Sequence, residues 1–249
     1  MFQPVVTPSA PLSPASVLIV GYGAFGRLLA RMLAPHLPVA VCDPDPAARA
    51  AAAGQGLRVL EPQAAGGCDL VVLAVPVPAL AQSLRQLAPH LRAGQTVCDV
   101  CSIKEAPVAL MRRLLPACVD ILGTHPLFGP QSLGRAPGPA RVVLCPVRGG
   151  GWRRIAAFLR GGLELRVIVT TPEEHDRHAA LTQGITHRLA RAMAAFQPHP
   201  QIRTGSFDLL MQALAMVAAD APEVYEAVTR GNAHVAPLCD RFARLLTEG

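Results

Sequence analysis

The sequence is poor in lysine, in aromatic residues and in charge. Among its 249 residues Lys104 is the only lysine, aromatic residues make up 4% and charged residues 16%. The net charge is +6, because 23 basic residues outnumber 17 acidic ones, but the arginines are scattered along the chain. Proteins that bind nucleic acids usually cluster basic residues beside stacking aromatics. The composition therefore argues against nucleic-acid binding, whereas a modest positive potential suits a small anionic ligand.

The sequence also lacks long apolar runs. No uninterrupted run approaches the roughly 18 residues that a membrane-spanning helix needs. The first sixteen residues, MFQPVVTPSAPLSPAS, are rich in Pro and Ser and lack the basic and apolar segments of a secretory signal. We expect residues 1–16 to be a flexible tail, and the protein to be cytoplasmic with no membrane partner.

The seven cysteines do not form a recognisable disulfide or metal framework. Their number is odd and five of them lie in or beside apolar stretches, which predicts free thiols in a reducing compartment. Cys98 and Cys101 form a CxxC pair, and without a second pair a structural role is favoured over zinc or redox chemistry. We therefore predict no metal site.

What the sequence does contain is a regular alternation of apolar runs and helix-like segments from Val17 onward. Hydrophobic residues make up 51% of the chain. Continuous apolar runs between helices predict parallel strands that are covered on both faces. The pattern predicts an α/β fold, a Rossmann doubly wound parallel sheet over residues 17–170. The predicted strands are 17–20, 39–43, 69–75, 96–100, 118–125, 141–147 and 165–170.

From Thr171 the pattern becomes helical to the end of the chain. Thr171, Pro172 and Glu174 form a good helix start, with a capping side chain, a first-turn proline and an acid at the third helical position. Further helices are expected over 205–219, from about 222, and over 237–247. A small all-helical unit of residues 171–249 buries little apolar surface by itself. We expect it to pack on the Rossmann domain and on a second copy, which gives a homodimer.

A dinucleotide-binding turn is predicted at GYGAFG, because this segment follows the first strand and opens a helix. Gly21 allows the tight turn, Gly23 lets the backbone approach the pyrophosphate, and Gly26 allows close packing of helix and strand. Asp43 ends the second predicted strand, where an acid binds the adenosine ribose and repels the 2′-phosphate of NADP. The predicted cofactor is therefore NAD, and the turn residues assigned to it are Gly21, Tyr22, Gly23, Ala24, Phe25 and Gly26.

Polar residues gather in three further segments, DVCSIK (99–104), GTHPLFGP (123–130) and EEHDRHAALTQGITH (173–187). Ligands of open parallel sheets bind beyond the carboxyl ends of the strands. We therefore expect Ser102, Lys104 and His125 to project toward one crevice. An alternative role for Ser102 is to cap the helix that begins near Lys104.

The third segment is expected to present a polar helix face across this crevice. Helical spacing groups these side chains on or beside one face: His178, Thr182, Gln183, Thr186 and His187. For His187 an ordinary surface position is the alternative. His175 and Asp176 fall in the first turn of the helix, where a solvated or structural role is favoured over a catalytic one.

Taken together, GYGAFG, CDLVVLAVP, DVCSIK, GTHPLFGP and EEHDRHAALTQGITHRLARAM resemble the prephenate and arogenate dehydrogenases. The segment 204–232 continues the likeness, especially to the plant-type arogenate branch, and HPLFGP combined with DVCSIK is its most specific part. The resemblance covers nearly all of the chain after the tail. It implies a Rossmann domain, a helical dimerisation domain and the NAD-dependent oxidative decarboxylation of a cyclohexadienol in tyrosine biosynthesis.

The resemblance also implies roles for individual residues. His125 would accept the hydrogen bond or the proton of the C4 hydroxyl of the substrate, since a neutral imidazole suits this task near pH 7. Ser102 would hold the same hydroxyl, and Val75 and Pro76 would lie near the nicotinamide. The residues implied for substrate binding are Lys104, Gln131, Thr182, Gln183, Thr186 and His187.

One departure from the family pattern bears on the substrate. The family commonly has an acid after HPLFGP, but this chain has Gln131, and no Asp or Glu lies between Asp120 and Glu164. The ammonium group of arogenate calls for an anionic partner, so we expect prephenate. The alternatives are arogenate or a related cyclohexadienol. A non-enzymatic NAD-binding sensor is disfavoured by the intact His125 and Ser102.

Overall fold

The computed structural model describes residues 14–134 and 138–248. Residues 1–13 of the predicted tail therefore lie outside the described part. Ser16, which the sequence analysis placed in that tail, is held at the edge of the sheet. Its hydroxyl donates to Asp69 Oδ2 at 3.1 Å and its carbonyl oxygen accepts from the backbone N–H of Leu70 at 3.1 Å.

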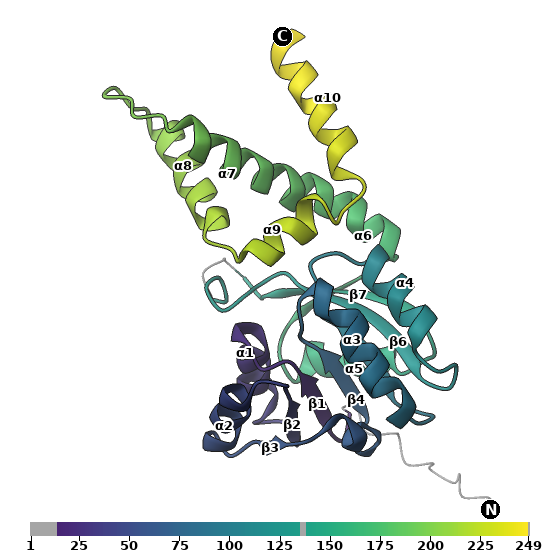
Figure 1. Cartoon of the computed structure of the whole chain (residues 1–249). Helices are drawn as coiled ribbons and strands as arrows, with labels where there is room; N and C mark the ends of the chain where they lie inside the picture. Colours follow the sequence, from purple (N-terminus) through teal and green to yellow (C-terminus); the bar gives the residue numbers. More distant parts are fainter. Residues whose placement is uncertain (1–13, 135–137, 249) are drawn as a thin grey trace, which may run out of the picture.

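A single eight-stranded sheet, in the order β3-β2-β1-β4-β5-β6-β7-β8, forms the centre of the molecule (Figure 1). Its strand order and the helices on both faces confirm the predicted doubly wound Rossmann architecture. The sheet is mixed rather than wholly parallel, because β6 and β7 pair antiparallel. The described residues between β6 and β7 include no crossover helix, and the chain returns beside β6 in the opposite direction. The strands are β1 (Val17–Val20), β2 (Val39–Cys42), β3 (Arg58–Val59), β4 (Leu70–Leu73), β5 (Thr96–Asp99), β6 (Asp120–Pro126), β7 (Arg141–Arg148) and β8 (Arg166–Val169).

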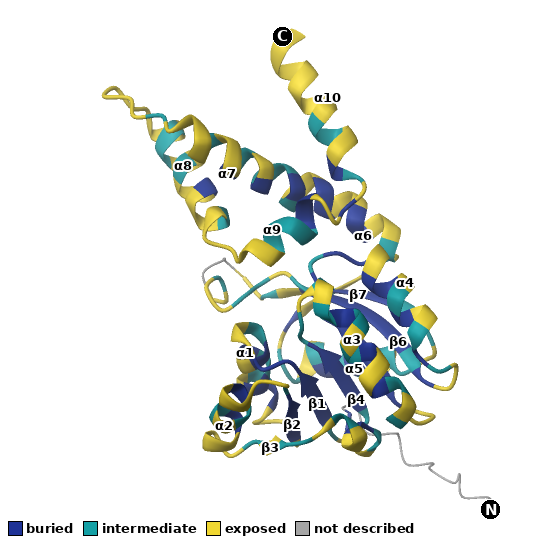
Figure 2. Ribbon diagram, viewed as in Figure 1, coloured by how far each residue is buried: buried dark blue, intermediate teal, exposed yellow. Residues whose placement is uncertain are grey.

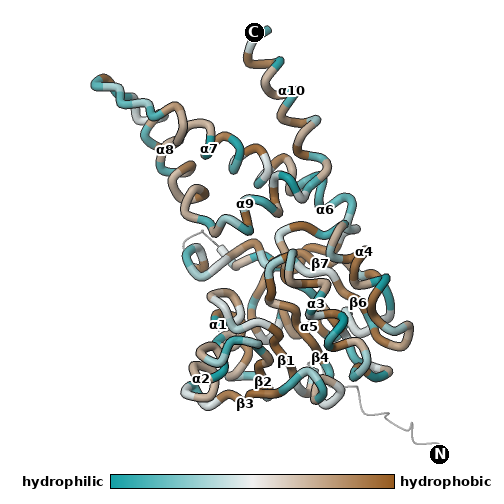
Figure 3. The backbone as a smooth tube through the Cα atoms, viewed as in Figure 1, coloured by the Kyte–Doolittle hydropathy of each residue, from teal (hydrophilic) through white to brown (hydrophobic). Residues whose placement is uncertain are grey.

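Each face of the sheet has its own apolar core. Successive strand residues point to opposite faces, so Val17 and Ile19 belong to one buried cluster, whereas Leu18 and Val20 belong to the other. Buried residues of α1 (Ala24–Leu33), α2 (Pro46–Gly54) and α5 (Trp152–Gly161) complete the first cluster, and those of α3 (Val77–Leu87) and α4 (Glu105–Leu114) complete the second. Figure 3 shows the hydrophobic residues concentrated in the strands between these layers.

The rest of the chain is helical, as predicted. It consists of α6 (Pro172–Ala179), a π-helical turn (Ala180–Gly184), α7 (Ile185–Phe196), α8 (Gly205–Ala218), α9 (Pro222–Thr229) and α10 (Val235–Glu248). The hydroxyl of Thr171 accepts from the backbone N–H of Glu174 at 3.2 Å, so the predicted cap of α6 is confirmed. In Figure 1, α7 and α8 form a hairpin that extends away from the sheet, α9 lies between this hairpin and the α/β layers, and α10 projects outward.

The π-helical turn was not predicted. It adds a residue to one turn and rotates the side chains of α7 relative to those of α6. Gly184 ends this turn, and a β-carbon there would lie 2.4 Å from Val235 Cγ2. Glycine therefore allows the start of α10 to pack directly on the helix backbone.

Several helical residues leave apolar side chains in solvent. Figure 2 shows that α8 and α10 are mostly exposed. Leu209 of α8 is 68% exposed and Leu246 of α10 is 69% exposed, and Met216, Phe242 and Leu245 are also exposed. Within residues 14–134 and 138–248, no helix is both long enough and apolar enough to cross a membrane.

Candidate active site and nucleotide site

The glycine-rich turn between β1 and α1 has the geometry that a dinucleotide requires. Gly21 has a φ of +98°, and a β-carbon there would lie 2.6 Å from Ala74 O. At Gly26 a β-carbon would meet Gly21 O at 2.0 Å, so only glycine lets α1 approach the turn. A β-carbon on Gly23 would meet no atom within 4 Å. The space beside Gly23, at the N-terminus of α1, is therefore open, which the expected phosphate contact requires.

Asp43 lies beside this turn and is fixed by it. Its Oδ2 accepts from the backbone N–H of Tyr22 at 2.6 Å, and its Oδ1 accepts from that of Asp45 at 2.8 Å. Arg49 Nη1 lies 3.4 Å from the carbonyl oxygen of Asp43. The carboxylate thus stands at the carboxyl end of β2, where a ribose diol would bind, with one guanidinium close by.

The other residues assigned to the cofactor surround the same turn. Val75 Cγ1 lies 2.9 Å from the position of a β-carbon on Gly21, and the exposed Pro76 precedes α3. Ala24 is exposed in the first turn of α1. The ring of Phe25 lies 6.4 Å from that of Phe128, centroid to centroid, so the loop after β6 contacts the nucleotide site.

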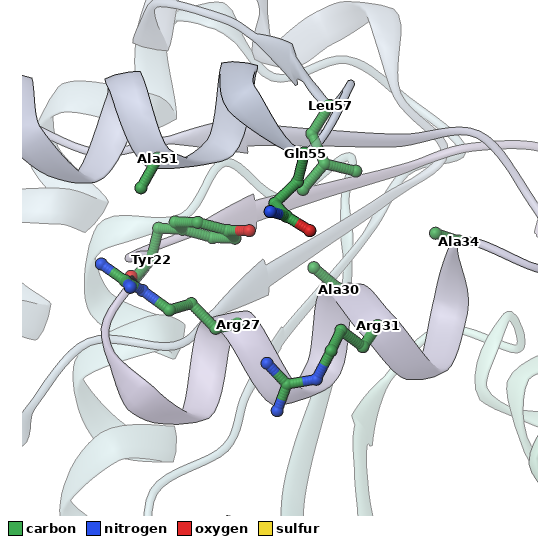
Figure 4. A pocket seen from close by; sticks show the side chains of 8 residues that line it. All are labelled: Tyr22, Arg27, Ala30, Arg31, Ala34, Ala51, Gln55 and Leu57. Atoms are coloured by element: carbon green, nitrogen blue, oxygen red, sulfur yellow. Dashed lines mark hydrogen bonds between the residues drawn. The ribbon is translucent and has the colours of Figure 1, made fainter.

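The side chain of Tyr22 points away from the turn. Its ring is buried and lines a hollow of about 360 Å³ between α1 and α2, together with Arg27, Arg31 and Gln55 (Figure 4). The Arg27 guanidinium lies 5.4 Å from the centre of the Tyr22 ring. Tyr22 therefore acts on the nucleotide site through its backbone N–H. This hollow does not include His125 or the strand ends of the predicted crevice.

His125 and Ser102 lie at the carboxyl ends of adjacent strands. Asp99 of β5 pairs with Gly123 of β6. Ser102 lies three residues after Asp99, and His125 lies two residues after Gly123, so both are near the same edge of the sheet. His125 is buried, whereas Ser102 is half-buried. In the described part of the chain the Ser102 hydroxyl makes no hydrogen bond, and α4 begins without a side-chain cap. The capping role for Ser102 is therefore wrong, and its hydroxyl remains available to a ligand.

A chain of hydrogen bonds links His125 to the helical part of the molecule. His125 Nδ1 lies 2.8 Å from His175 Nε2, and His175 Nδ1 lies 2.7 Å from Asp176 Oδ1. All three side chains are buried. Burial holds the pKa of His125 well below its usual value of 6.5, and the neighbouring His175 and Lys104 lower it further. His125 is therefore neutral at pH 7.

Lys104 is buried in the interior, where it contacts the backbone of Thr124, the residue before His125. It is fully buried, its ammonium pairs with the carboxylate of Asp99, and it donates to the carbonyl oxygen of Thr124 at 2.5 Å. The backbone N–H of Thr124 faces Asp99 Oδ1 at 3.4 Å. This ion pair joins β5, β6 and the start of α4. Two of the three N–H donors of Lys104 bind these oxygens in the interior. The substrate contact that the resemblance implied for Lys104 stays a prediction.

The polar residues of the long helix differ in their surroundings. The hydroxyl of Thr182 donates to His178 O at 3.0 Å, and that of Thr186 donates to Thr182 O at 2.5 Å. His178 itself is exposed and lies 3.1 Å from Glu174. The side-chain oxygen of Gln183 is buried without a partner among the described residues. The substrate contacts expected of this helix face therefore stay predictions.

His187 lines a second hollow, of about 440 Å³, between α7, α8 and α9. It is buried, so the surface alternative for it is wrong. Its Nδ1 lies 2.9 Å from Gln183 O and its Nε2 lies 3.1 Å from Asp220 Oδ2. The Arg191 guanidinium lies 4.7 Å from the centre of the Tyr225 ring in the same hollow. Charges of both signs therefore surround this space.

Gln131 is exposed on the loop after β6. Residues 135–137 of this loop lie outside the described residues, and no contact places Gln131 in the crevice. Its substrate contact stays a prediction.

Sequence reasoning missed His175, Asp176 and Asp99 as parts of this site. Asp176 also accepts from the backbone N–H groups of Lys104 and Glu105, at 2.7 and 2.9 Å. An acid in the first turn of a helix is ordinarily explained by the dipole of its own helix. That explanation gave no reason to expect Asp176 to contact α4. The adjacency of His175 and Asp176 in EEHD was the one available signal. No cluster with metal-ligand spacing occurs in the part of the chain that the structure describes.

Comparisons with known proteins place the fold and the family. The family model for the nucleotide-binding domain of prephenate dehydrogenase matches residues 28–160, more than half of the chain. A probable arogenate/prephenate dehydrogenase of Methanocaldococcus jannaschii is 27% identical, over 72% of this chain and 42% of that protein. Arogenate dehydrogenase 1 of Arabidopsis thaliana is 30% identical, over 85% of this chain and 35% of that protein. The chain thus spans less than half the length of these two relatives.

The fold matches that of solved members. The crystal structure of prephenate dehydrogenase from A. aeolicus, in complex with hydroxyphenyl propionate and NAD⁺, superposes with a TM-score of 0.74 at 21% identity. It covers 94% of this chain and 88% of that one. With the glycine-rich turn, the buried histidine and the family match in agreement, the chain belongs to the prephenate dehydrogenase family.

Proposed function

We propose that this protein is an NAD-dependent dehydrogenase that converts prephenate to 4-hydroxyphenylpyruvate by oxidative decarboxylation. The observation that carries the proposal is the position of the buried, neutral His125 and of Ser102 at the carboxyl ends of adjacent strands, the sheet edge that also holds the glycine-rich turn. The Ser102 hydroxyl has no partner among the described residues. A neutral imidazole is the form that can accept a proton.

The mechanism assigns a task to each of these residues. Gly21, Gly23, Gly26 and Asp43 would hold NAD, which supplies the hydride acceptor for C4 of the substrate. Ser102 donates a hydrogen bond to the C4 hydroxyl and orients it. His125 takes the hydroxyl proton as the hydride leaves C4. After CO₂ departs from C1 and its electron pair enters the ring, His125 returns the proton to the phenolate oxygen.

The preference for prephenate rests on charge. Between Asp120 and Glu164 the loop beyond His125 contains no acid, and Gln131 can donate its amide N–H to a neutral keto oxygen. An ammonium group without an anionic partner would lose a charged hydrogen bond, at a cost of about 1.5–3 kcal/mol, or roughly 10- to 150-fold in kcat/KM.

A second candidate substrate is arogenate, and one contact favours it. Asp220 places a carboxylate in the hollow that His187 lines, and this carboxylate could receive an ammonium group. His187 Nε2 already lies 3.1 Å from Asp220 Oδ2 and occupies one oxygen of this carboxylate. We therefore keep prephenate as the first proposal.

The exposed apolar side chains of α8 and α10 support a homodimer. Leu209 and Leu246 are each more than two-thirds exposed on these helices. A second copy that packs its own helices against this surface would bury them.

The test of the proposed function compares both substrates. NADH formation is measured with prephenate and with arogenate at saturating NAD, for the wild-type protein and for Asp220→Asn. A higher kcat/KM with prephenate, unchanged in the variant, supports the proposal. Preference for arogenate that disappears in Asp220→Asn would establish the second candidate, and no NADH with either substrate would refute both.

A further inference from the structure

We propose that His175 and Asp176 are positioning residues that determine which ring nitrogen of His125 carries the proton. The inference builds on the proposed function, in which the unprotonated nitrogen of His125 accepts the substrate proton. The three side chains are contiguous, buried and drawn from both parts of the chain, since His125 ends β6 and the other two lie on α6.

The direction of these hydrogen bonds follows from Asp176, the last member of the series. The carboxylate of Asp176 can only accept, so His175 Nδ1 donates its proton to Asp176 Oδ1 across 2.7 Å. The proposal takes the His175 ring as neutral, so its other nitrogen is an acceptor. His175 Nε2 must therefore accept from His125 Nδ1 across 2.8 Å. This leaves Nε2 of His125 without a proton, and no described residue donates to it.

The carboxylate at the end of this chain is itself held firmly. Asp176 accepts from the first backbone N–H groups at the start of α4, at 2.7 and 2.9 Å. The side chain of Asn232, between α9 and α10, donates to the backbone oxygen of Asp176 at 2.8 Å. Asp176 thus caps a helix of the α/β part while it belongs to α6. The orientation of His125 is consequently tied to the contact between the two parts of the chain.

The same arrangement explains how His125 can hold a proton during turnover. The charged groups near it are the carboxylate of Asp176, which His175 contacts, and the ammonium of Lys104, which Asp99 balances. When Nε2 takes a proton, Nδ1–H continues to donate to His175, and the negative end of the chain, Asp176, faces the new positive charge. No rearrangement of the hydrogen bonds is needed.

Two substitutions of His175 separate positioning from mere packing. His175→Gln keeps an acceptor, the side-chain oxygen, within reach of His125 Nδ1, whereas His175→Leu fills the space without one. We expect His175→Leu to lower kcat by about 10²-fold or more, because the wrong tautomer of a catalytic histidine has costs of up to about 10⁴-fold. His175→Gln should remain within about tenfold of the wild type. The affinity for NAD and the KM should change little in either variant, and His36→Gln serves as a distant surface control.

The tautomer itself can be observed without any turnover. In ¹⁵N NMR spectra of the wild-type protein at pH 7.5, His125 should show a protonated Nδ1 and an unprotonated Nε2, and in His175→Leu it should show a mixture of both forms. A wild-type His125 protonated on Nε2, or equal kcat values for the Leu and Gln variants, would overturn the proposal. If His175→Leu does not fold, the wild-type spectrum and His175→Gln still decide. An inactive wild type with the expected tautomer would refute the proposed function alone.

Discussion

Replacing His125 by Asn removes the proposed proton acceptor and should leave the nucleotide site intact. The Asn side chain is short enough for the cavity and retains an amide N–H near the position of His125 Nδ1. General-base assistance contributes about 10²- to 10⁴-fold, which corresponds to roughly 2.7–5.5 kcal/mol of activation free energy. We expect kcat with prephenate to fall by this factor, with the affinity for NAD unchanged, because no hydrogen bond among the described residues joins His125 to Asp43 or to the glycine-rich turn.

The activity and the stability of the wild-type protein should both depend on the protonation of His125. The pKa of folded His125 lies well below 6.5, whereas in the unfolded chain it is near 6.5. Activity should therefore hold as the pH falls to about 6.5 and should be lost only as it falls further, through the folded pKa. Between these two values the unfolded state binds the proton and the native state does not, so the free energy of unfolding should also decrease. In His125→Asn this part of the decrease should vanish.

The measurements are initial rates of NADH formation, titration with NAD, and urea unfolding at pH 7.5 and 5.5, with His36→Asn as the surface control. Near-normal kcat in His125→Asn would remove this residue from the mechanism. An acid limb of activity centred above pH 6.5 would contradict the burial argument for its pKa.

Three further predictions concern other parts of the molecule. Gly184→Ala should lower the free energy of unfolding by about 1–3 kcal/mol, because its β-carbon would lie 2.4 Å from Val235 Cγ2. Gly205→Ala, which has open space around it, should not destabilise the protein. Urea unfolding of both variants tests this, and equal stabilities would contradict it. Asp43→Ser should narrow or reverse the preference for NAD over NADP, since it removes the carboxylate expected to repel a 2′-phosphate and leaves the Arg49 guanidinium in place. Equal preferences in variant and wild type would contradict it. Light scattering at micromolar concentration should give the mass of a dimer, and Leu246→Arg should give a monomer; a monomeric wild type would refute the dimer.

The sequence was sufficient to predict the parts of the fold that local patterns encode. Each apolar run became a strand and GYGAFG became the turn between β1 and α1, because a buried parallel strand and a glycine of positive φ leave direct marks on the sequence. The sequence pattern does not indicate the direction of β7. An antiparallel strand and a parallel one are equally apolar when both faces are covered, and only the missing crossover helix distinguishes them.

The sequence predicted the site residues that directly follow strands. It did not predict the contacts between residues that are distant in the sequence. His125 and Ser102 lie at strand ends, as their spacing indicated. Lys104 lies there too, but its pairing with Asp99 depends on side-chain direction in three dimensions. The contact of Asp176 with α4 spans more than 70 residues of sequence, and the π-helical turn that separates α6 from α7 has no sequence signature. These features required the structure.

The central claim is that His125 acts as a neutral base in the oxidation of a cyclohexadienol. The most direct test is a single experiment with purified wild-type protein and His125→Asn, each given prephenate and saturating NAD at pH 7.5, with NADH and 4-hydroxyphenylpyruvate both quantified. The account predicts equal amounts of the two products from the wild type, and a kcat lower by at least about 10²-fold in the variant, with NAD still bound. Wild-type protein that binds NAD but forms neither product, or a variant that forms both at the wild-type rate, would contradict it.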